Sequence, residues 1–169
     1  RYNQNGTLDT GFNSGLSTLP LIKSGSGAVN AIVMQANGQI VVGGTLIASG
    51  ATGSNLVRLN SNGSIDSSFN AVVNQTVTGI IQQYNGQLII AGSFTQVNGV
   101  TCGGIARLNF DGSIDATFNP ITNGTVNAIT QQIDGSIILG GTFTKVGNLT
   151  RNYLARVTSS GVVDTAFNP

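Results

Sequence analysis

The chain has 169 residues, of which seven are basic and six acidic, so its formal net charge is +1. A charge near zero gives no long-range electrostatic reason to expect nucleic acid or an anionic membrane as partner, and no apolar stretch reaches the roughly 18 residues of a membrane-spanning helix. Charged residues make up only 8% of the chain, against about 25% in a typical soluble domain. Asn, Ser, Thr, Gln and Gly supply the polarity instead, which is typical of short strands joined by tight turns.

The first 13 residues contain a segment that returns three times. It reads RYNQNGTLDTGFN from Arg1, RLNSNGSIDSSFN from Arg58, RLNFDGSIDATFN from Arg107 and RVTSSGVVDTAFN from Arg156. The last two spacings are both 49 residues, and the first is 57. Each copy predicts two strands joined at a dipeptide that ends in Gly, and we expect a two-residue type I′ turn with positive φ at both central residues.

Residues 14–27 are an insertion, because the later intervals contain nothing that corresponds to them. The insertion holds the one apolar segment outside the repeat, and its large apolar residues are Leu16, Leu19, Leu21 and Ile22. This segment either folds over the adjacent repeat or forms an interface with a partner or a second copy, since exposed apolar patches often mark interfaces.

Three full units follow, over residues 29–70, 77–119 and 126–168, and residues 1–13 form a half unit. The first half of each full unit reads VNAIVMQANGQIVVGGTL, VTGIIQQYNGQLIIAGSF or VNAITQQIDGSIILGGTF. We expect one strand, a Gly-containing turn and a second strand, whose continuous apolar run predicts burial on both faces. The small-residue pair that ends this run indicates a bend or a close approach of two backbones.

Four-stranded antiparallel repeats of about 50 residues predict an all-β fold of β-propeller-like blades, in a single repeat domain over residues 1–169. A β-sandwich or a β-solenoid is the alternative. Because the chain begins inside a repeat, we expect it to be part of a longer protein. Propellers typically have four to eight blades, so three and a half units predict completion by additional repeats of the same chain or by a homo-oligomer.

The sequence resembles the delta-60 repeat of bacterial β-propeller proteins. The pattern is carried by Arg107 to Pro120, Gln132 to Thr144 and Gly147 to Arg156, and the first unit departs from it with Leu46 in place of a Phe. The resemblance implies a large secreted or surface-attached bacterial protein, similar to adhesins, and hence an extracellular or cell-surface location. It carries over no catalytic residue.

Every carboxylate occupies a position of the repeat template. One position is held by Asp9, Asp66, Asp115 and Asp164, and two turn positions are held by Asp111 and Asp134. In the hairpin each Asp of the first set lies close to the Arg that opens its segment, so we expect a structural Arg–Asp pair in each unit. Repeated surroundings do not separate pKa values as acid–base catalysis requires, and the chain has no His. We therefore predict that it is not an enzyme, unless a partner chain contributes the missing residues.

Neither a metal nor a cofactor is expected. Calcium is the alternative at Asn109, Asp111 and Asp115, whose oxygen atoms have a spacing similar to that of calcium loops. The single cysteine, Cys102, cannot form an intrachain disulfide. We expect an exposed thiol in a loop, with an intermolecular disulfide or metal binding as alternatives.

Residues that depart from the template are the candidate ligand contacts, and they are Tyr84, Arg151, Asn152 and Tyr153. Tyr84 stands at a turn where the next unit has Ile133, and Asn152 and Tyr153 replace two glycines of the preceding unit. We predict a non-enzymatic binding module, an adhesin or fibre-type domain that recognises a cell-surface glycan or protein. We predict no nucleic-acid partner and no membrane insertion. The alternative function is a structural repeat spacer or scaffold in a larger surface protein.

Overall fold

The structure is a computed structural model, and it describes residues 1–13, 27–46 and 55–169. The candidate interface residues Leu16, Leu19, Leu21 and Ile22 lie outside the described residues. Within the described part of the chain, no helix is long and apolar enough to cross a membrane.

Each full unit contains a three-stranded antiparallel sheet. The sheets are β1 (Ala28–Met34), β2 (Ile40–Thr45) and β3 (Leu56–Leu59); β4 (Val77–Gln82), β5 (Leu88–Gly92) and β8 (Ile105–Leu108); and β9 (Val126–Gln131), β10 (Ile137–Gly141) and β13 (Leu154–Val157). A fourth segment pairs with the third strand through one bridge per unit, at Leu59–Ile65, Leu108–Ile114 and Val157–Val163. The predicted fold of tandem four-stranded antiparallel repeats is therefore confirmed, although the fourth strand of each unit forms only a single bridge with the third.

Smaller elements complete the described chain. The half unit forms the bridge Tyr2–Leu8 and the 3-10 helix η1 (Thr10–Asn13). Two hairpins that the sequence did not predict lie between the second and third strands of the later units, and they are β6 (Gln96–Val97) with β7 (Val100–Thr101) and β11 (Lys145–Val146) with β12 (Leu149–Thr150).

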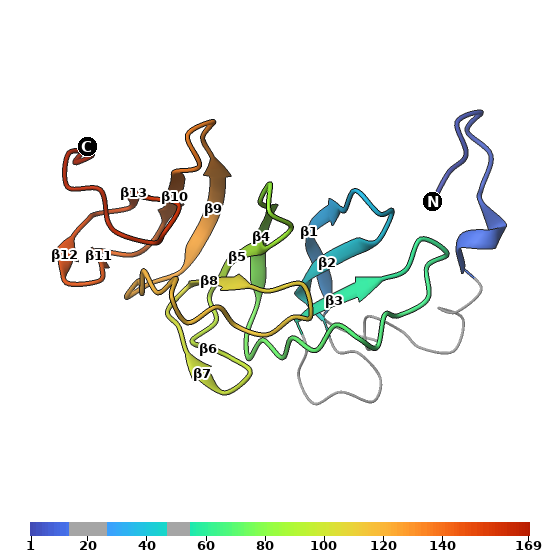
Figure 1. The fold of residues 1–169 in the computed structure, drawn as a ribbon, viewed down its shortest axis with the longest axis horizontal. Helices are drawn as coiled ribbons and strands as arrows, with labels where there is room; N and C mark the ends of the chain where they lie inside the picture. The colour runs from blue at the N-terminus through green and yellow to red at the C-terminus, as the bar shows by residue number, and fades with distance from the viewer. Residues whose placement is uncertain (14–26, 47–54) are drawn as a thin grey trace.

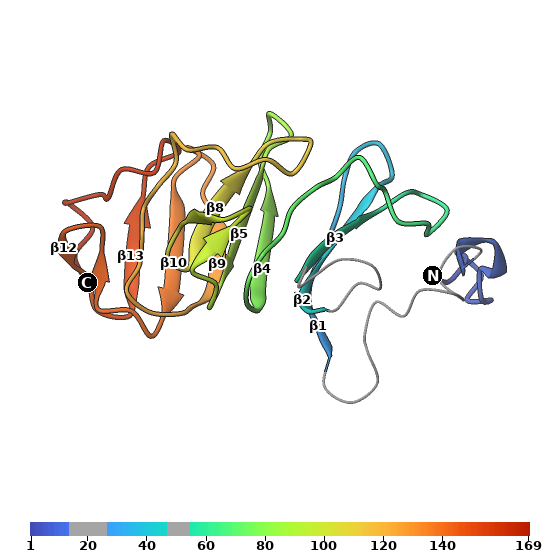
Figure 2. The same cartoon turned by 90° about the horizontal axis from the view of Figure 1, so that it is seen from below.

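The three sheets follow one another in an open arc, and the half unit lies beyond the first of them (Figures 1 and 2). The first strands of successive units are neighbours, because β1 contacts β4 and β4 contacts β9. This is the arrangement of successive propeller blades, with the first strand of each blade innermost. The arc does not close on itself (Figure 2).

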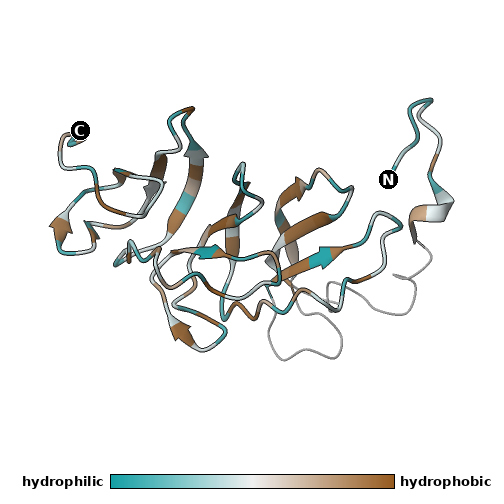
Figure 3. Ribbon diagram, viewed as in Figure 1, coloured by the Kyte–Doolittle hydropathy of each residue, from teal (hydrophilic) through white to brown (hydrophobic). Residues whose placement is uncertain are grey.

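The core lies between successive sheets, and the second strand of the middle unit contributes to both sides of its own sheet. Ile89 packs in the cluster with Ile137 of the third unit, whereas its neighbour Ile90 packs in the cluster with Val41 of the first unit. Every residue of β5 is buried, as its apolar run predicted. Figure 3 accordingly shows hydrophobic stretches along the strands, interrupted by hydrophilic residues on β3, β8 and β9, and many hydrophilic residues at the turns.

The glycine at the end of each second strand allows the first strand to pass close by. A Cβ atom at Gly44, Gly92 or Gly141 would lie about 2 Å from a backbone carbonyl oxygen, that of Ala28, Thr76 or Thr125. The predicted close approach of two backbones is thus confirmed, and it coincides with a register shift in each of the three strand pairs.

The prediction of type I′ turns was wrong. In the turn after β3, Gly63 N donates to Asn60 O at 2.9 Å and Asn60 N donates to Ser64 O at 2.8 Å. Gly63 has a φ of 88°, but Asn62 is not in the positive-φ region, so this is a type I turn followed by a glycine bulge. Asn62 is favoured here because its Oδ1 accepts from Ser64 N at 3.0 Å, which holds the turn without a positive φ at the Asn itself.

Candidate functional site

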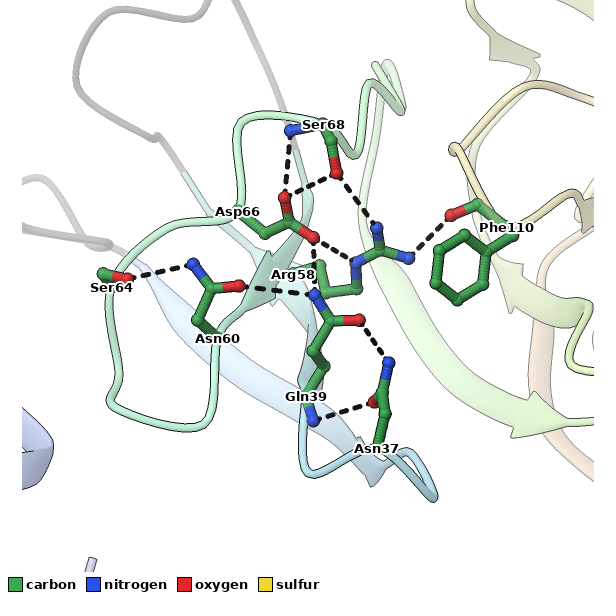
Figure 4. A network of polar contacts seen from close by, with 8 residues as sticks. All are labelled: Asn37, Gln39, Arg58, Asn60, Ser64, Asp66, Ser68 and Phe110. Atoms are coloured by element: carbon green, nitrogen blue, oxygen red, sulfur yellow. Dashed lines mark hydrogen bonds and ion pairs between the residues drawn. The ribbon is translucent and has the colours of Figure 1, made fainter.

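Among the described residues, the most buried polar side chain is that of Arg58 (Figure 4), which is 1% exposed. Its Nε donates to Asp66 Oδ2 at 2.7 Å, and its Nη1 donates to Phe110 O of the following unit at 2.6 Å. The guanidinium also lies over the rings of Phe69, at 4.7 Å, and Phe110, at 4.5 Å. The predicted Arg–Asp pair is confirmed, and it reaches across the boundary between two units.

Both oxygen atoms of the Asp66 carboxylate accept two hydrogen bonds each (Figure 4). Oδ2 also accepts from Gln39 Nε2 at 2.7 Å, and Oδ1 accepts from Ser68 N at 3.0 Å and Ser68 Oγ at 2.7 Å. Burial raises the pKa of Asp66, but the hydrogen bonds from Ser68 and Arg58 outweigh it and lower the pKa to about 2. Asp66 is therefore ionised near neutral pH.

The same Arg–Asp pair recurs in the other three copies of the segment, as Arg1–Asp9, Arg107–Asp115 and Arg156–Asp164. Arg1 Nη1 donates to Ser61 O at 3.0 Å and Arg107 Nη1 donates to Ser159 O at 2.7 Å, so both reach the turn of the following unit. We call this group of Arg, its Asp, the Phe beneath it and the turn of the following unit the Arg clip. The Arg clip is a structural joint between successive units.

The residues considered for calcium take part in hydrogen bonds of the repeat. Asp111 Oδ1 accepts from Ser113 N at 2.9 Å and from Ser113 Oγ at 2.7 Å. Asn109 Oδ1 accepts from Gln87 at 3.0 Å, and Asp115 accepts from Arg107 at 2.8 Å. No three His, Cys, Asp or Glu side chains are grouped as for a metal ion within residues 1–13, 27–46 and 55–169.

The prediction that Cys102 is an exposed thiol was wrong. The side chain is buried in the cluster between the first and second units, together with Val97. Cys102 N donates to Thr95 O at 2.9 Å, so the unpredicted β6–β7 hairpin turns the residue inward. Burial raises the pKa of the Cys102 thiol to about 11, and a thiol of this kind is unreactive.

Tyr84 lies at the tip of the hairpin between β4 and β5, and its side chain is 93% exposed. It borders an open hollow of about 480 Å³ that is lined also by Ala36, Gln82, Gln83, Asn85 and Gly86. Ala36 belongs to the corresponding turn of the first unit, so the hollow lies between two neighbouring turns.

Gln83 is a residue of this hollow that the sequence did not single out. It is buried, and its Oε1 has no hydrogen-bond partner. The same holds for Gln35 in the first unit, whereas Gln132 Oε1 of the third unit accepts from Arg156 at 3.5 Å. The recurrence of Gln at this position was visible in the sequence, but nothing in the sequence indicated that its carbonyl oxygen would lack a donor.

The other candidate residues lie in the third unit, immediately before β13. Arg151 is buried, and its guanidinium donates to the backbone carbonyls of Thr150, Asp164 and Thr165. Asn152 is exposed, and Tyr153 is 64% exposed. Tyr84 lies at the turn end of its sheet and Tyr153 at the opposite end of another, so the structure does not bring the candidates into one site.

Tyr153 has an unusual backbone. Its φ is 67°, a region that bulky residues rarely adopt. Leu154 N donates to Asn152 O at 2.8 Å, which makes Tyr153 the central residue of a γ-turn with positive φ, a strained form. The equivalent residue of the second unit is Gly104, with a φ of 68°.

Repeated sheets, stacked face to face and joined by the Arg clip, define a β-propeller repeat protein. The sequence matches the family described as "Domain of unknown function (DUF5122) beta-propeller" three times, over residues 35–69, 83–118 and 132–167. These matches cover more than half of the chain, so the chain belongs to this family. Each match ends at or next to the Phe of an Arg clip.

No curated protein matches the sequence. Among solved structures, the chain is similar to a protein of unknown function from Bacteroides caccae, with 16% identity and a TM-score of 0.49. The alignment covers 80% of this chain and 49% of that protein's chain, so this chain spans about half the length of the solved one.

Proposed function

We propose that the chain is a non-enzymatic binding module of a secreted or surface-attached protein, and that it binds a glycan in the hollow beside Tyr84. The observation that carries the proposal is the position of Tyr84, an aromatic residue that the repeat does not require and that is almost completely exposed. An exposed tyrosine offers an apolar ring to the C–H face of a sugar and a hydroxyl to its polar edge.

The lining of the hollow supports a polyhydroxylated ligand. Gln82 and Gln83 also line the hollow that Tyr84 borders, and an amide side chain both donates and accepts hydrogen bonds, as sugar hydroxyls do. The unpartnered Oε1 of Gln83 is an acceptor whose burial without a donor is unfavourable. A rotation of the Gln83 side chain toward the hollow would let this oxygen accept a hydrogen bond from a sugar hydroxyl.

The charged residues support a role without catalysis. The pKa of Asp66 and that of Asp115 are both lowered to about 2, chiefly by hydrogen bonds from Ser68 and Thr117 and further by those from Arg58 and Arg107, so neither carboxylate is suited to act as a base near pH 7. The chain has no His to take this role. The proposal includes no cofactor, with calcium at Asn109, Asp111 and Asp115 as its alternative.

The resemblance to the delta-60 repeat supports an extracellular or cell-surface location, and both the delta-60 assignment and the adhesin-type role are part of the proposal. A cell-surface protein is the alternative ligand. A structural spacer is the second candidate function, and it is favoured by the Arg clips, which use the charged residues of the repeat to join one unit to the next.

A glycan array followed by NMR titration tests the proposal. We expect a glycan ligand whose addition shifts the Tyr84 and Gln83 resonances. Tyr84→Ala should weaken binding about tenfold, since an aromatic contact contributes about 0.5–1.5 kcal/mol beyond its buried area. Ile133→Ala is the matched control, because Ile133 is 97% exposed at the same turn position of the third unit. Binding to no glycan, or equal loss in both variants, would reject the site and favour the spacer.

A further inference from the structure

A buried amide side chain bridges the first and second units. Asn55 is 8% exposed; its Oδ1 accepts from Leu46 N at 3.0 Å, and its Nδ2 donates to Val73 O at 2.9 Å. Leu46 lies just after β2, whereas Val73 lies in the segment that leads from the first unit into β4. One carboxamide therefore satisfies a backbone donor and a backbone acceptor that would be costly to bury without partners.

The second and third units meet at the same pair of backbone groups, but no amide bridges them. Gly104 holds the position of Asn55, since both carbonyl oxygens accept from the glycine N–H at the end of the second strand, at 2.9 and 3.0 Å. Phe94 and Thr122 hold the positions of the two residues that Asn55 bridges. Phe94 N donates no hydrogen bond and Thr122 O accepts none in the part of the chain that the structure describes. Both residues are buried, so this junction lacks the acceptor and the donor that an amide supplies.

A hollow of about 410 Å³ lies at this junction, and we call it the inter-unit hollow; Phe94 and Thr122 both line it. Its volume is within the roughly 300–1,000 Å³ of ligand pockets and far above the roughly 30 Å³ of one water molecule. The Phe94 ring packs in the cluster with the first unit, so Phe94 reaches the hollow with its backbone. A Cβ atom at Gly104 would lie 2.3 Å from Thr122 Oγ1. A side chain at that position is therefore excluded, and an amide has to enter the hollow from solvent.

The rest of the lining suits a neutral ligand that carries hydroxyl groups. Ser93, Thr101 and Thr125 line the inter-unit hollow, and their hydroxyl groups have no hydrogen-bond partner among the described residues. A hydroxyl group both donates and accepts hydrogen bonds. Ile121, which is 38% exposed, adds an apolar side chain. The described lining contains no charged residue, so nothing in it favours a charged ligand over a neutral one.

We propose that the inter-unit hollow binds the acetamido group of an N-acetylated sugar, whose carbonyl accepts from Phe94 N and whose N–H donates to Thr122 O. The acetamido group thereby repeats the two hydrogen bonds that Asn55 makes at the preceding junction. The sugar hydroxyls face the free Ser and Thr hydroxyls, and the methyl group lies against Ile121. The inter-unit hollow is at the end of the sheets opposite Tyr84, and the proposal does not rest on the glycan site there.

An NMR titration of the whole chain with N-acetylglucosamine tests the proposal, and glucose is the probe that lacks the acetamido group. We expect N-acetylglucosamine to shift the backbone amide resonances of Phe94 and Gly104, with the Phe94 amide proton moving downfield as it gains an acceptor. Glucose should bind at least about tenfold more weakly, because both backbone groups then stay unpaired. An absence of shifts at Phe94 and Gly104, or equal affinities for the two sugars, would overturn the proposal.

The variant Thr101→Trp gives the sharper measurement. Thr101 is exposed and lines the inter-unit hollow, so a large ring there should obstruct the hollow and abolish measurable binding of N-acetylglucosamine. Thr150→Trp is the matched control, because Thr150 is exposed and pairs with Lys145 as Thr101 pairs with Gln96, but it does not line the hollow. Thermal melts followed by circular dichroism verify that both variants are folded.

Three results of these measurements would contradict the site. They are binding retained in Thr101→Trp, an equal loss in both Trp variants, and stronger binding of an Asn-rich peptide than of N-acetylglucosamine. Tyr84→Ala should leave this binding unchanged, so failure here and failure of the glycan site beside Tyr84 are distinguishable.

Discussion

Replacing Arg58 by Ala should destabilise the protein more than the same change at any other Arg clip. Arg58 and Asp66 have side chains 1% and 10% exposed, and removing one partner of a buried ion pair costs about 3–5 kcal/mol. The loss arises because Asp66 keeps its charge and Phe110 O loses its donor. For Arg1, whose side chain is 48% exposed, solvent replaces the lost partner and the effect should be much smaller.

The measurement is equilibrium unfolding in guanidinium chloride, followed by circular dichroism. The loss in the free energy of unfolding should be largest for Arg58→Ala, and it should decrease through Arg107→Ala and Arg156→Ala to Arg1→Ala. This is the order of increasing exposure of the four side chains. The double variant Arg58→Met/Asp66→Leu removes both charges. It should recover most of the stability lost in Arg58→Ala, because no buried charge is left unpaired.

Equal losses for Arg58→Ala and Arg1→Ala would refute the reasoning, since they would show that burial does not determine the contribution of the clip. A double variant no more stable than Arg58→Ala would show that the loss comes from the contact with Phe110 and not from the unpaired Asp66.

Four further predictions concern individual residues. The pKa values of Asp66 and Asp115 are lowered to about 2 from the ordinary value of 3.8, so their contribution to stability is present above about pH 4 and lost as the pH falls toward 2. The denaturant concentration at the unfolding midpoint should therefore decrease as the pH falls from about 4 to about 2, and it should decrease less in Asp66→Asn/Asp115→Asn. Gly112→Ala should destabilise by more than the roughly 1–2 kcal/mol expected for Gly86→Ala, because the two glycines share a φ of 86° but only Gly112 is crowded; equal unfolding free energies would contradict this. Cys102, with its raised thiol pKa, should react with a thiol reagent only on the timescale of unfolding, and reaction at the rate of a free thiol would contradict its burial. Tyr153→Gly should stabilise the protein by about 1 kcal/mol in a thermal or denaturant melt, because it removes a strained positive φ, and a loss of stability would show that the tyrosine ring makes a compensating contact.

The repeat made much of the fold predictable. Residues that recur at the same position of every copy are those that the fold requires, whereas residues found in one copy are not. The Arg–Asp pairs and the buried run of β5 were predicted on this basis. The turn type was not, because Asn-Gly suits both a type I′ turn and a type I turn with a glycine bulge. The β6–β7 and β11–β12 hairpins have strands of two residues, too short to show a periodicity.

Contacts between units were the part that the sequence could not supply. Arg58 and Phe110 are 52 residues apart, and no local pattern indicates that the second donor of the guanidinium reaches that carbonyl. The burial of Cys102 depends on the path of a hairpin that was itself not predicted. For the candidate site, departure from the template singled out Tyr84, which is exposed, but also Arg151, which is buried, and it could not indicate the unpartnered oxygen of Gln83.

The distinction between residues that recur in every repeat and residues that depart from the repeat pattern also bears on where a ligand would bind. Template side chains such as Arg58, Asp66 and Phe69 are occupied by one another and by the neighbouring unit. Tyr153 is different, because it replaces a glycine, has a strained φ and leaves its side chain exposed. A strained residue that the fold does not require persists when another role compensates for the strain. Recognition is therefore to be sought at such positions, and the repeat holds them in place.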